Sequence, residues 1–299
     1  MTIVPPEELV PSSQRWALLS MARGRLRGQH LFIAGAIVLL VILVMAVLAP
    51  WITPYPQDAQ GGVDQVNSLL APSAQHWFGT DQVGRDVYTR VVFGARTSLL
   101  IVFSVLFLSV IIGVTLGVIA GYAGGWVRDV VMRVTDVFLA FPALLLSLAL
   151  CIVLQPDLKT AILAITVTWW PWYTRLAAGV AASISGRAYM DAVRALGISP
   201  ARAVFRHVLP NSLTPVIVQL SLDAGGIILT AAALSFLGLG AQEPTPEWGL
   251  MVSQGQDLFT TAYWVSLFPG LAILLAAFAF NMMGEGLRTA LDPRRVMAS

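Results

Sequence analysis

Six long apolar runs separated by polar segments dominate the pattern of this 299-residue chain. Each run is near or above the roughly 20 residues that a helix needs to cross about 30 Å of hydrocarbon. The pattern therefore predicts an all-α polytopic membrane protein with six transmembrane helices in one domain, residues 31–286. The runs cover residues 31–51, 98–121, 130–154, 161–182, 214–240 and 262–286.

Composition independently requires a membrane. Hydrophobic residues make up 57% of the chain and charged residues 11%, with a mean hydropathy of +0.77, whereas about a quarter of a soluble domain is charged. The first run is too long for the apolar part of a signal peptide and has no small-x-small cleavage site before Pro50, so we expect it to remain as an anchor. The single cysteine, Cys151, allows no intrachain disulfide and indicates no metal cluster.

Basic residues are distributed unevenly between the segments that join the runs. If the N-terminus is inside, fourteen of the eighteen basic residues lie at or near the cytoplasm, and Arg85, Arg90, Arg96 and Lys159 lie outside. This asymmetry predicts cytoplasmic segments at 1–30, 187–210 and 287–299, and a far-side loop at 53–97. The formal net charge of +2 therefore reflects topology and gives no reason to expect a nucleic-acid partner.

The polar segment 187–210 has a helical pattern of its own. Gly197 is expected to end a first short helix, in which Asp191 can pair with Arg194. Ser199 is a good N-cap and Pro200 a good first residue for a second helix, which should close at Leu209-Pro210. The apolar positions at helical spacing are Tyr189, Val193 and Leu196 in the first helix and Ala201, Val204, Phe205 and Val208 in the second. Two short helices bent at a glycine make a compact shape that can dock into a groove of another protein.

At these positions the chain resembles the membrane permeases of binding-protein-dependent ABC importers. Their cytoplasmic loop carries Glu-Ala-Ala, three residues, Gly, nine residues and then Ile-x-Leu-Pro. The matching residues here are Asp191, Ala192, Val193, Gly197, His207, Leu209 and Pro210, with Asp, Val and His departing from the pattern. The resemblance implies that 187–210 is a coupling loop that contacts ATPases. Its candidate contact residues are Tyr189, Asp191, Ala192, Gly197, Ser199, Pro200, Arg202, Phe205, Arg206, Leu209 and Pro210.

The far-side loop indicates which branch of these permeases the chain resembles. Its first half is rich in Pro and Gly and is typical of irregular surface chain. Residues 76–99 resemble the signature of the dipeptide, oligopeptide and nickel branch of these permeases, as do residues 235–240, 244–249 and the tail motif Leu291-Asp292-Pro293. The resemblance runs from about Arg25 to Arg295, almost the whole chain.

Membership of that branch would imply a set of partners. They are a second homologous permease subunit, two cytoplasmic ABC ATPase subunits or domains, and an extracytoplasmic solute-binding protein, all at the plasma (inner) membrane of a prokaryote. ATP and Mg would be bound by the ATPases, and this chain would hold no cofactor. Peptides are the first expected cargo, with nickel chelates, glutathione-like and other small solutes as alternatives.

The chain lacks the motifs of an ATPase or another enzyme, which agrees with ATP being bound by separate subunits. A P-loop needs Gly-x-x-x-x-Gly-Lys followed by Ser or Thr, but the one lysine, Lys159, follows Leu158. The sequence has no Gly-x-Ser-x-Gly and no His-Glu-x-x-His, and its three histidines are scattered. We therefore expect no catalytic residues and no metal site, so the chain is a transport component and not an enzyme.

Several residues inside the runs are candidates for a translocation path. Asp223 is costly to bury in a membrane, so it either lines an aqueous path or hydrogen-bonds to a neighbouring helix. Trp169, Trp170 and Trp172 lie too deep for an interfacial belt and either line the cavity or pack around Pro171.

Two further patterns concern contacts between helices. Gly113, Gly117 and Gly121 recur every four residues, which predicts the close approach of another helix. Asp136 has Arg128 and Arg133 as candidate partners, and we expect an ion pair at the membrane edge.

Two other functions are compatible with six spans. A secondary transporter could couple protons through Asp223 or Glu285, although the chain shows no evident internal repeat. A scaffold that transports nothing would leave Asp223 and the far-side signature unexplained.

Overall fold

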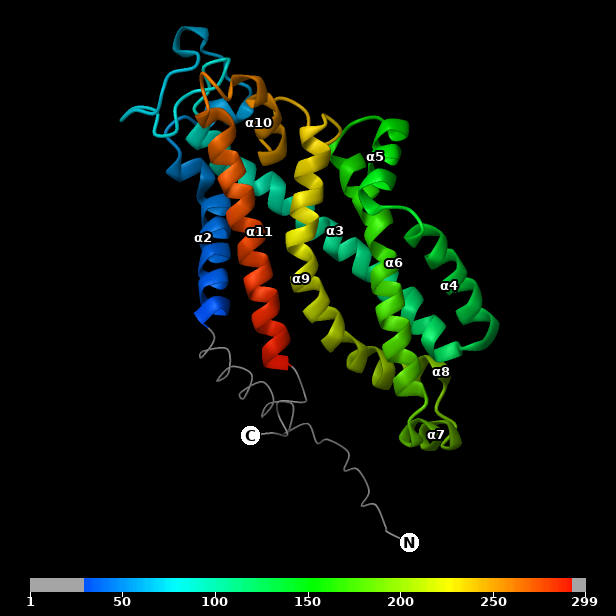
Figure 1. Cartoon of the computed structure of the whole chain (residues 1–299). Coiled ribbons are helices and arrows are strands. Elements are labelled where there is room, and N and C mark those ends of the chain that lie inside the picture. Colours follow the sequence, from blue (N-terminus) through cyan, green and yellow to red (C-terminus); the bar gives the residue numbers. More distant parts are fainter. Residues whose placement is uncertain (1–29, 292–299) are drawn as a thin grey trace.

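The computed structural model describes residues 30–291 as a bundle of helices, without a β-strand within that range (Figure 1). The all-α prediction is therefore confirmed for this part of the chain. Predicted segment 1–30, apart from His30, lies outside the described residues. The same holds for residues 292–299 of the predicted tail, which include two residues of its Leu-Asp-Pro motif.

Within residues 30–291, ten α-helices make up the bundle and its two ends. They are α2 (His30–Ile52), α3 (Val87–Ala123), α4 (Gly125–Leu139), α5 (Ala143–Leu154), α6 (Leu158–Ser185), α7 (Ala188–Ala195), α8 (Pro200–Ala203), α9 (Leu209–Phe236), α10 (Trp248–Gln254) and α11 (Trp264–Leu291). The short helices α7 and α8 lie at one end of the bundle, while α10 and the loop after α2 lie at the opposite end (Figure 1).

Four helices are long and apolar enough to cross a membrane: α2, α3, the continuous stretch Pro200–Phe236, and α11. The predicted run 130–154 is not one straight helix. It is divided between α4 and α5, which meet at an angle of 84° and make a fifth candidate span if the bent pair is one span. The break falls before Pro142, which disfavours helical geometry at Phe141, and mean hydropathy does not report such a bend.

The second run also begins earlier than predicted. Helix α3 starts at Val87, where the Asp86 side chain accepts a hydrogen bond from the Thr89 N–H at 2.7 Å and caps the helix. The far-side loop therefore ends at Asp86 and not at residue 97. Polar residues mask the helix in the sequence, but Val87 and Val92 are fully buried in the core of the bundle.

Helices α3 and α6 pack most closely, as the glycine pattern predicted. A Cβ at Gly113 would lie 2.6 Å from the Trp170 carbonyl, and one at Gly117 would lie 2.5 Å from the Thr174 carbonyl. Gly121 faces Ala181 in the same way. The absence of side chains on α3 therefore lets the backbone of α6 lie directly against it.

Candidate functional site

The coupling loop begins with α7, whose inner side is anchored to the bundle. Met190 is fully buried and Val193 nearly so, in a cluster with Ile184 of α6. Arg194 forms the expected pair with Asp191 at 2.9 Å and also donates to the Ser185 carbonyl at 3.1 Å. These contacts fix α7 to the end of α6.

Gly197 makes the turn that follows α7. Its φ of +72° is a left-handed conformation that side chains other than glycine's rarely adopt. A Cβ at this position would meet nothing within 4 Å, so the requirement for glycine is conformational and not steric.

The second half of the coupling loop differs from the prediction. Pro200 does begin α8, but the Ser199 side chain makes no capping hydrogen bond, and its carbonyl instead accepts from the Ala203 N–H at 2.9 Å. The second helix also does not end at Leu209-Pro210. One turn of π-helix, Val204–Val208, joins α8 to α9. This wider turn accommodates the missing N–H of Pro210, so the helix continues without a break.

The outer side of the coupling loop is apolar in part. Leu196 is 78% exposed and Phe205 is 70% exposed, whereas Val193 and Val208, apolar positions of the same two patterns, are buried. The other exposed candidates are Asp191, Ala192, Gly197, Ser199, Pro200, Arg202 and Arg206, while Tyr189, Leu209 and Pro210 are half-buried. Large apolar side chains beside arginines are typical of a surface that contacts another protein.

The three tryptophans of α6 point in different directions. Trp170 is buried and packs edge-on against Phe138, as expected of a packing residue. Trp169 faces α9, where its ring would lie 3.6 Å from a Cβ at Gly226. Trp172 is 53% exposed and lines a hollow of about 370 Å³. They therefore do not form one surface.

Asp223 lies between α9 and α6. Its Oδ1 accepts a hydrogen bond from Gln219 at 2.9 Å, within α9. Its Oδ2 is buried near the Tyr173 hydroxyl of α6 without meeting hydrogen-bond geometry. Trp172 lines the 370 Å³ hollow, but Asp223 does not. The two candidate residues for a translocation path therefore do not share this hollow.

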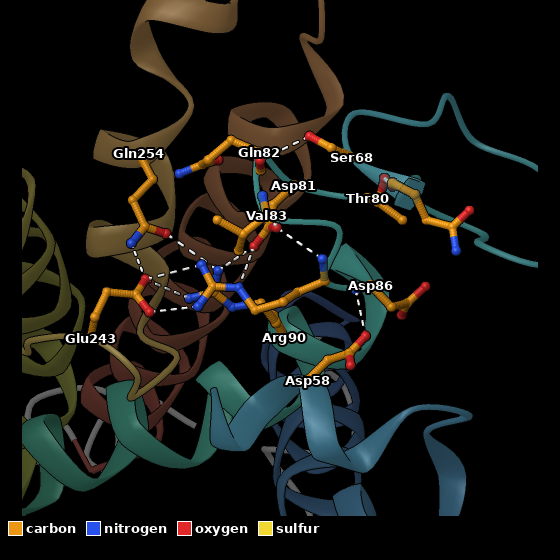
Figure 2. A network of polar contacts seen from close by, with 12 residues as sticks. Asp58, Ser68, Thr80, Asp81, Gln82, Val83, Asp86, Arg90, Glu243 and Gln254 are labelled. Atoms are coloured by element: carbon orange, nitrogen blue, oxygen red, sulfur yellow. Dashed lines mark hydrogen bonds and ion pairs between the residues drawn. The ribbon is translucent and has the colours of Figure 1, made fainter. Parts of the chain in front are cut away.

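A buried ionic network occupies the opposite end of the bundle (Figure 2). Asp81 Oδ2 lies 2.7 Å from Arg85 Nε and 2.5 Å from Arg90 Nη1. Both arginines also pair with Glu243, which accepts a further hydrogen bond from Gln254 of α10. The network joins the loop after α2, the start of α3 and the segment between α9 and α10.

The two arginines favour the ionised form of Glu243. Partial burial of Glu243 opposes ionisation, but the hydrogen bonds from Arg85 and the charge of Arg90 outweigh it and lower the pKa of this carboxyl to about 2. In the sequence, Asp81, Arg85 and Arg90 lie close together within residues 76–99. Their partner Glu243 is too distant in sequence for spacing rules to reveal.

A second contact reinforces the same end. Glu247 caps α10 by accepting from the Gly249 and Leu250 N–H groups at 3.0 and 2.9 Å, and it also accepts from Ser98 of α3 at 3.2 Å. Trp248 donates to the Val91 carbonyl at 2.8 Å. Helix α10 is therefore attached to α3.

Asp136 pairs with Arg175 of α6 at 2.5 Å, and not with Arg128 or Arg133 as expected. Within residues 30–291, no group of three His, Cys, Asp or Glu side chains comes together to hold a metal ion.

The chain matches a known family over most of its length. The pattern described as "Binding-protein-dependent transport system inner membrane component" matches residues 113–297. The chain belongs to this family of importer permeases. A second pattern, the "N-terminal TM domain of oligopeptide transport permease C", matches residues 17–72 of this permease. The expected resemblance to the peptide and nickel branch is confirmed.

Curated relatives cover nearly the whole permease. The dipeptide transport system permease protein DppC of Alkalihalophilus pseudofirmus is 42% identical over 97% of this chain and 93% of its own length. The probable D,D-dipeptide transport system permease protein DdpC of Escherichia coli K12 is 42% identical over 90% of this chain and 89% of its own. The glutathione transport system permease protein GsiD of E. coli O6:K15:H31 is 38% identical over 98% and 94%.

A solved structure shares the fold. The inward-facing MetNI methionine ABC transporter has a chain that superposes with a TM-score of 0.56 at 19% identity, covering 68% of this permease and 97% of that chain. The family makes this protein a permease subunit of an ABC importer, a transport component whose ATPase activity lies in partner subunits. It also implies a multi-pass membrane protein with ATPase and binding-protein partners, and it does not favour proton coupling.

Proposed function

We propose that this permease forms one half of a peptide importer of a prokaryotic inner membrane. The observation that carries the cargo assignment is the match to two dipeptide permeases at 42% identity. Glutathione, nickel chelates and other small solutes are the alternatives. The second half of the path is a homologous permease subunit.

The proposed topology has six spans. Helix α6 is the sixth, because its 28 residues extend about 42 Å at 1.5 Å per residue. Its Thr, Trp and Arg residues lower its mean hydropathy, but much of its polar surface is buried against neighbouring helices, as at Thr166 and Thr174. Six spans place both termini on one side, and the distribution of arginines makes that side the cytoplasm.

The coupling loop transmits the movement of the ATPases. Its exposed Leu196 and Phe205 dock into a groove of an ATPase subunit, beside Arg202 and Arg206. Helix α7 is attached to α6, and α8 continues into α9 through the π-turn. Closure of the ATPases on ATP therefore moves α6 and α9 together, opening the path toward the loaded binding protein.

Reconstitution tests this function. The permease alone in liposomes should transport nothing, with or without a proton gradient, because it has no P-loop and only half of the path. Together with its second permease, the ATPases and the binding protein, it should take up radiolabelled dialanine in an ATP-dependent way that survives a protonophore. Gradient-driven uptake by the isolated chain would overturn the proposal.

A further inference from the structure

A half-exposed ion pair joins α4 to α6. Arg175 donates from Nη2 to Asp136 Oδ1 at 2.5 Å. The two side chains are 51% and 56% exposed, so about half of the surface of each is left uncovered by residues 30–291.

Arg175 lies in the interior of α6, and Asp136 lies three residues before the end of α4 at Leu139, next to the bend between α4 and α5. Arg175 precedes the end of α6 at Ser185 by ten residues, or about 15 Å, and Asp136 follows the start of α4 by eleven residues. Charged side chains at such depth are too costly to face lipid, and they face a partner or a water-filled cavity. The α4–α6 face therefore borders protein or water.

Helix α4 has one polar and one apolar exposed side. Asp129, Arg133 and Asp136 recur at i, i+4 and i+7 and are exposed on one side. Trp126, Val130, Val134 and Val137 are exposed on another, also at helical spacing. One exposed face of α4 is thus suited to lipid and the other to water.

The ion pair adjoins the hollow of about 370 Å³. Thr168, Trp172 and Arg175 share one face of α6, and the first two line the hollow together with residues 138–143 at the bend between α4 and α5. Apolar and aromatic walls beside a few polar groups are typical of a binding site for a small molecule.

We propose that this face lines the aqueous path and that Asp136 and Arg175 form a subsite for a zwitterionic peptide. Arg175 binds the terminal carboxylate and Asp136 the terminal ammonium, while the side chains of the cargo lie in the hollow beside Trp172. A half-exposed ion pair is weak and can exchange partners, and a guanidinium suits a carboxylate well. The empty subsite has no net charge, so the cargo is released readily. This inference rests on the proposed peptide importer.

Cysteine labelling tests whether the face meets water, whatever the cargo. Ala140 is exposed and lines the hollow, whereas Leu40 is 61% exposed on α2, which carries no polar side chain between Leu31 and Ile52. The variants Ala140→Cys and Leu40→Cys, each with Cys151→Ala, are assembled with all partners in lipid nanodiscs and treated with a charged maleimide. The cysteine at 140 should react at least about tenfold faster, because thiols react as hydrated thiolates. Equal, slow reaction at both positions would overturn the proposal.

Uptake tests the subsite itself. In the reconstituted transporter, Asp136→Asn/Arg175→Gln should lower dialanine uptake by about tenfold or more, since two charge-assisted hydrogen bonds are lost. The matched variant Glu285→Gln/Arg288→Gln removes an exposed pair, 3.7 Å apart on α11, and should transport normally. Stimulation of ATP hydrolysis by the binding protein should be unchanged in both.

The outcomes separate this inference from the importer function. Unchanged dialanine uptake by Asp136→Asn/Arg175→Gln would contradict the subsite alone. A wild-type transporter that hydrolyses ATP on stimulation but moves no dialanine would contradict both the peptide cargo and the subsite, while leaving the ABC permease assignment intact.

Discussion

Arg85 donates two hydrogen bonds to Glu243, at 2.5 and 3.2 Å, across 158 positions of sequence. The pair connects the segment before α3 to the segment before α10. Arg85 is buried, whereas the Glu243 side chain is 42% exposed, so the pair lies near the surface at the end of the bundle opposite α7 and α8. The pair therefore holds the start of α3 and the segment between α9 and α10 together at that end.

The pH dependence of stability should reveal this pair. The pKa of Glu243 is about 2 in the folded chain against 4.5 for an unperturbed glutamate, so its stabilisation is fully present above pH 4.5 and is lost as pH falls toward 2. We expect Glu243→Gln to flatten the dependence of the unfolding temperature on pH in that window. The exposed Glu285→Gln is the control, and an equal flattening there would contradict the assignment.

Replacing a glycine by alanine should have opposite effects on the stability of the permease in α3 and in α6. Gly117→Ala would place a Cβ 2.5 Å from the Thr174 carbonyl and should destabilise the permease by about 1–3 kcal/mol. Gly179→Ala would meet nothing within 4 Å and should stabilise α6 by about 0.5–1 kcal/mol. Thermal unfolding of the purified variants checks both signs. Equal effects would show that α3 and α6 do not approach as described.

The proposed topology predicts which positions reach each side of the membrane. In a Cys151→Ala background, Gln60→Cys should react with an impermeant thiol reagent in intact cells, because the far-side loop is outside. Ala201→Cys, in α8, should react only after permeabilisation. Both positions are exposed in the structure, so burial would not explain a difference. The reverse pattern would invert the topology and place the coupling loop away from the ATPases.

Hydropathy predicted the helices well because each long helix is an apolar run, from α2 to α11. It could not predict the bend before Pro142, since an apolar run has the same hydropathy whether straight or bent at 84°. It also missed the start of α3, where Asp86 caps the helix and Thr89, Arg90 and Arg96 interrupt the apolar pattern. Long-range pairs such as Arg85 with Glu243 or Arg175 with Asp136 depend on packing and have no local pattern.

The coupling loop shows another limit of periodicity. The spacing of Leu196 and Phe205 indicated apolar faces, but it could not tell a face that packs on its own bundle from one that a partner covers. Both side chains are exposed, while the neighbouring Met190 and Val208 are buried. The pattern therefore identified the two helices but did not show which of their apolar side chains are buried.

Phe205 should contribute to docking and not to folding. Phe205→Ser removes a ring that is 70% exposed, so membrane insertion and unfolding temperature should be close to wild type. Affinity for the ATPase subunits should fall by about tenfold or more, as for an aromatic anchor of an interface. Phe259→Ser, 60% exposed at the far-side end, is the control for loss of an exposed ring. Unchanged ATPase affinity in Phe205→Ser would exclude this surface from the contact.

Gly197 provides the sharpest test of coupling because its requirement is conformational. With φ at +72°, Gly197→Val should strain the turn by roughly 1–2 kcal/mol and shift α7 relative to α8. Stimulated ATP hydrolysis and transport should both fall while the protein remains in the membrane. Gly197→Asn should retain more activity, since asparagine tolerates this conformation. Gly186→Ala, one helix earlier, has an ordinary φ of −85° and no contact closer than 3.6 Å, and should behave as wild type. Normal stimulated hydrolysis in a correctly inserted Gly197→Val would show that the bend does not transmit the movement of the ATPases.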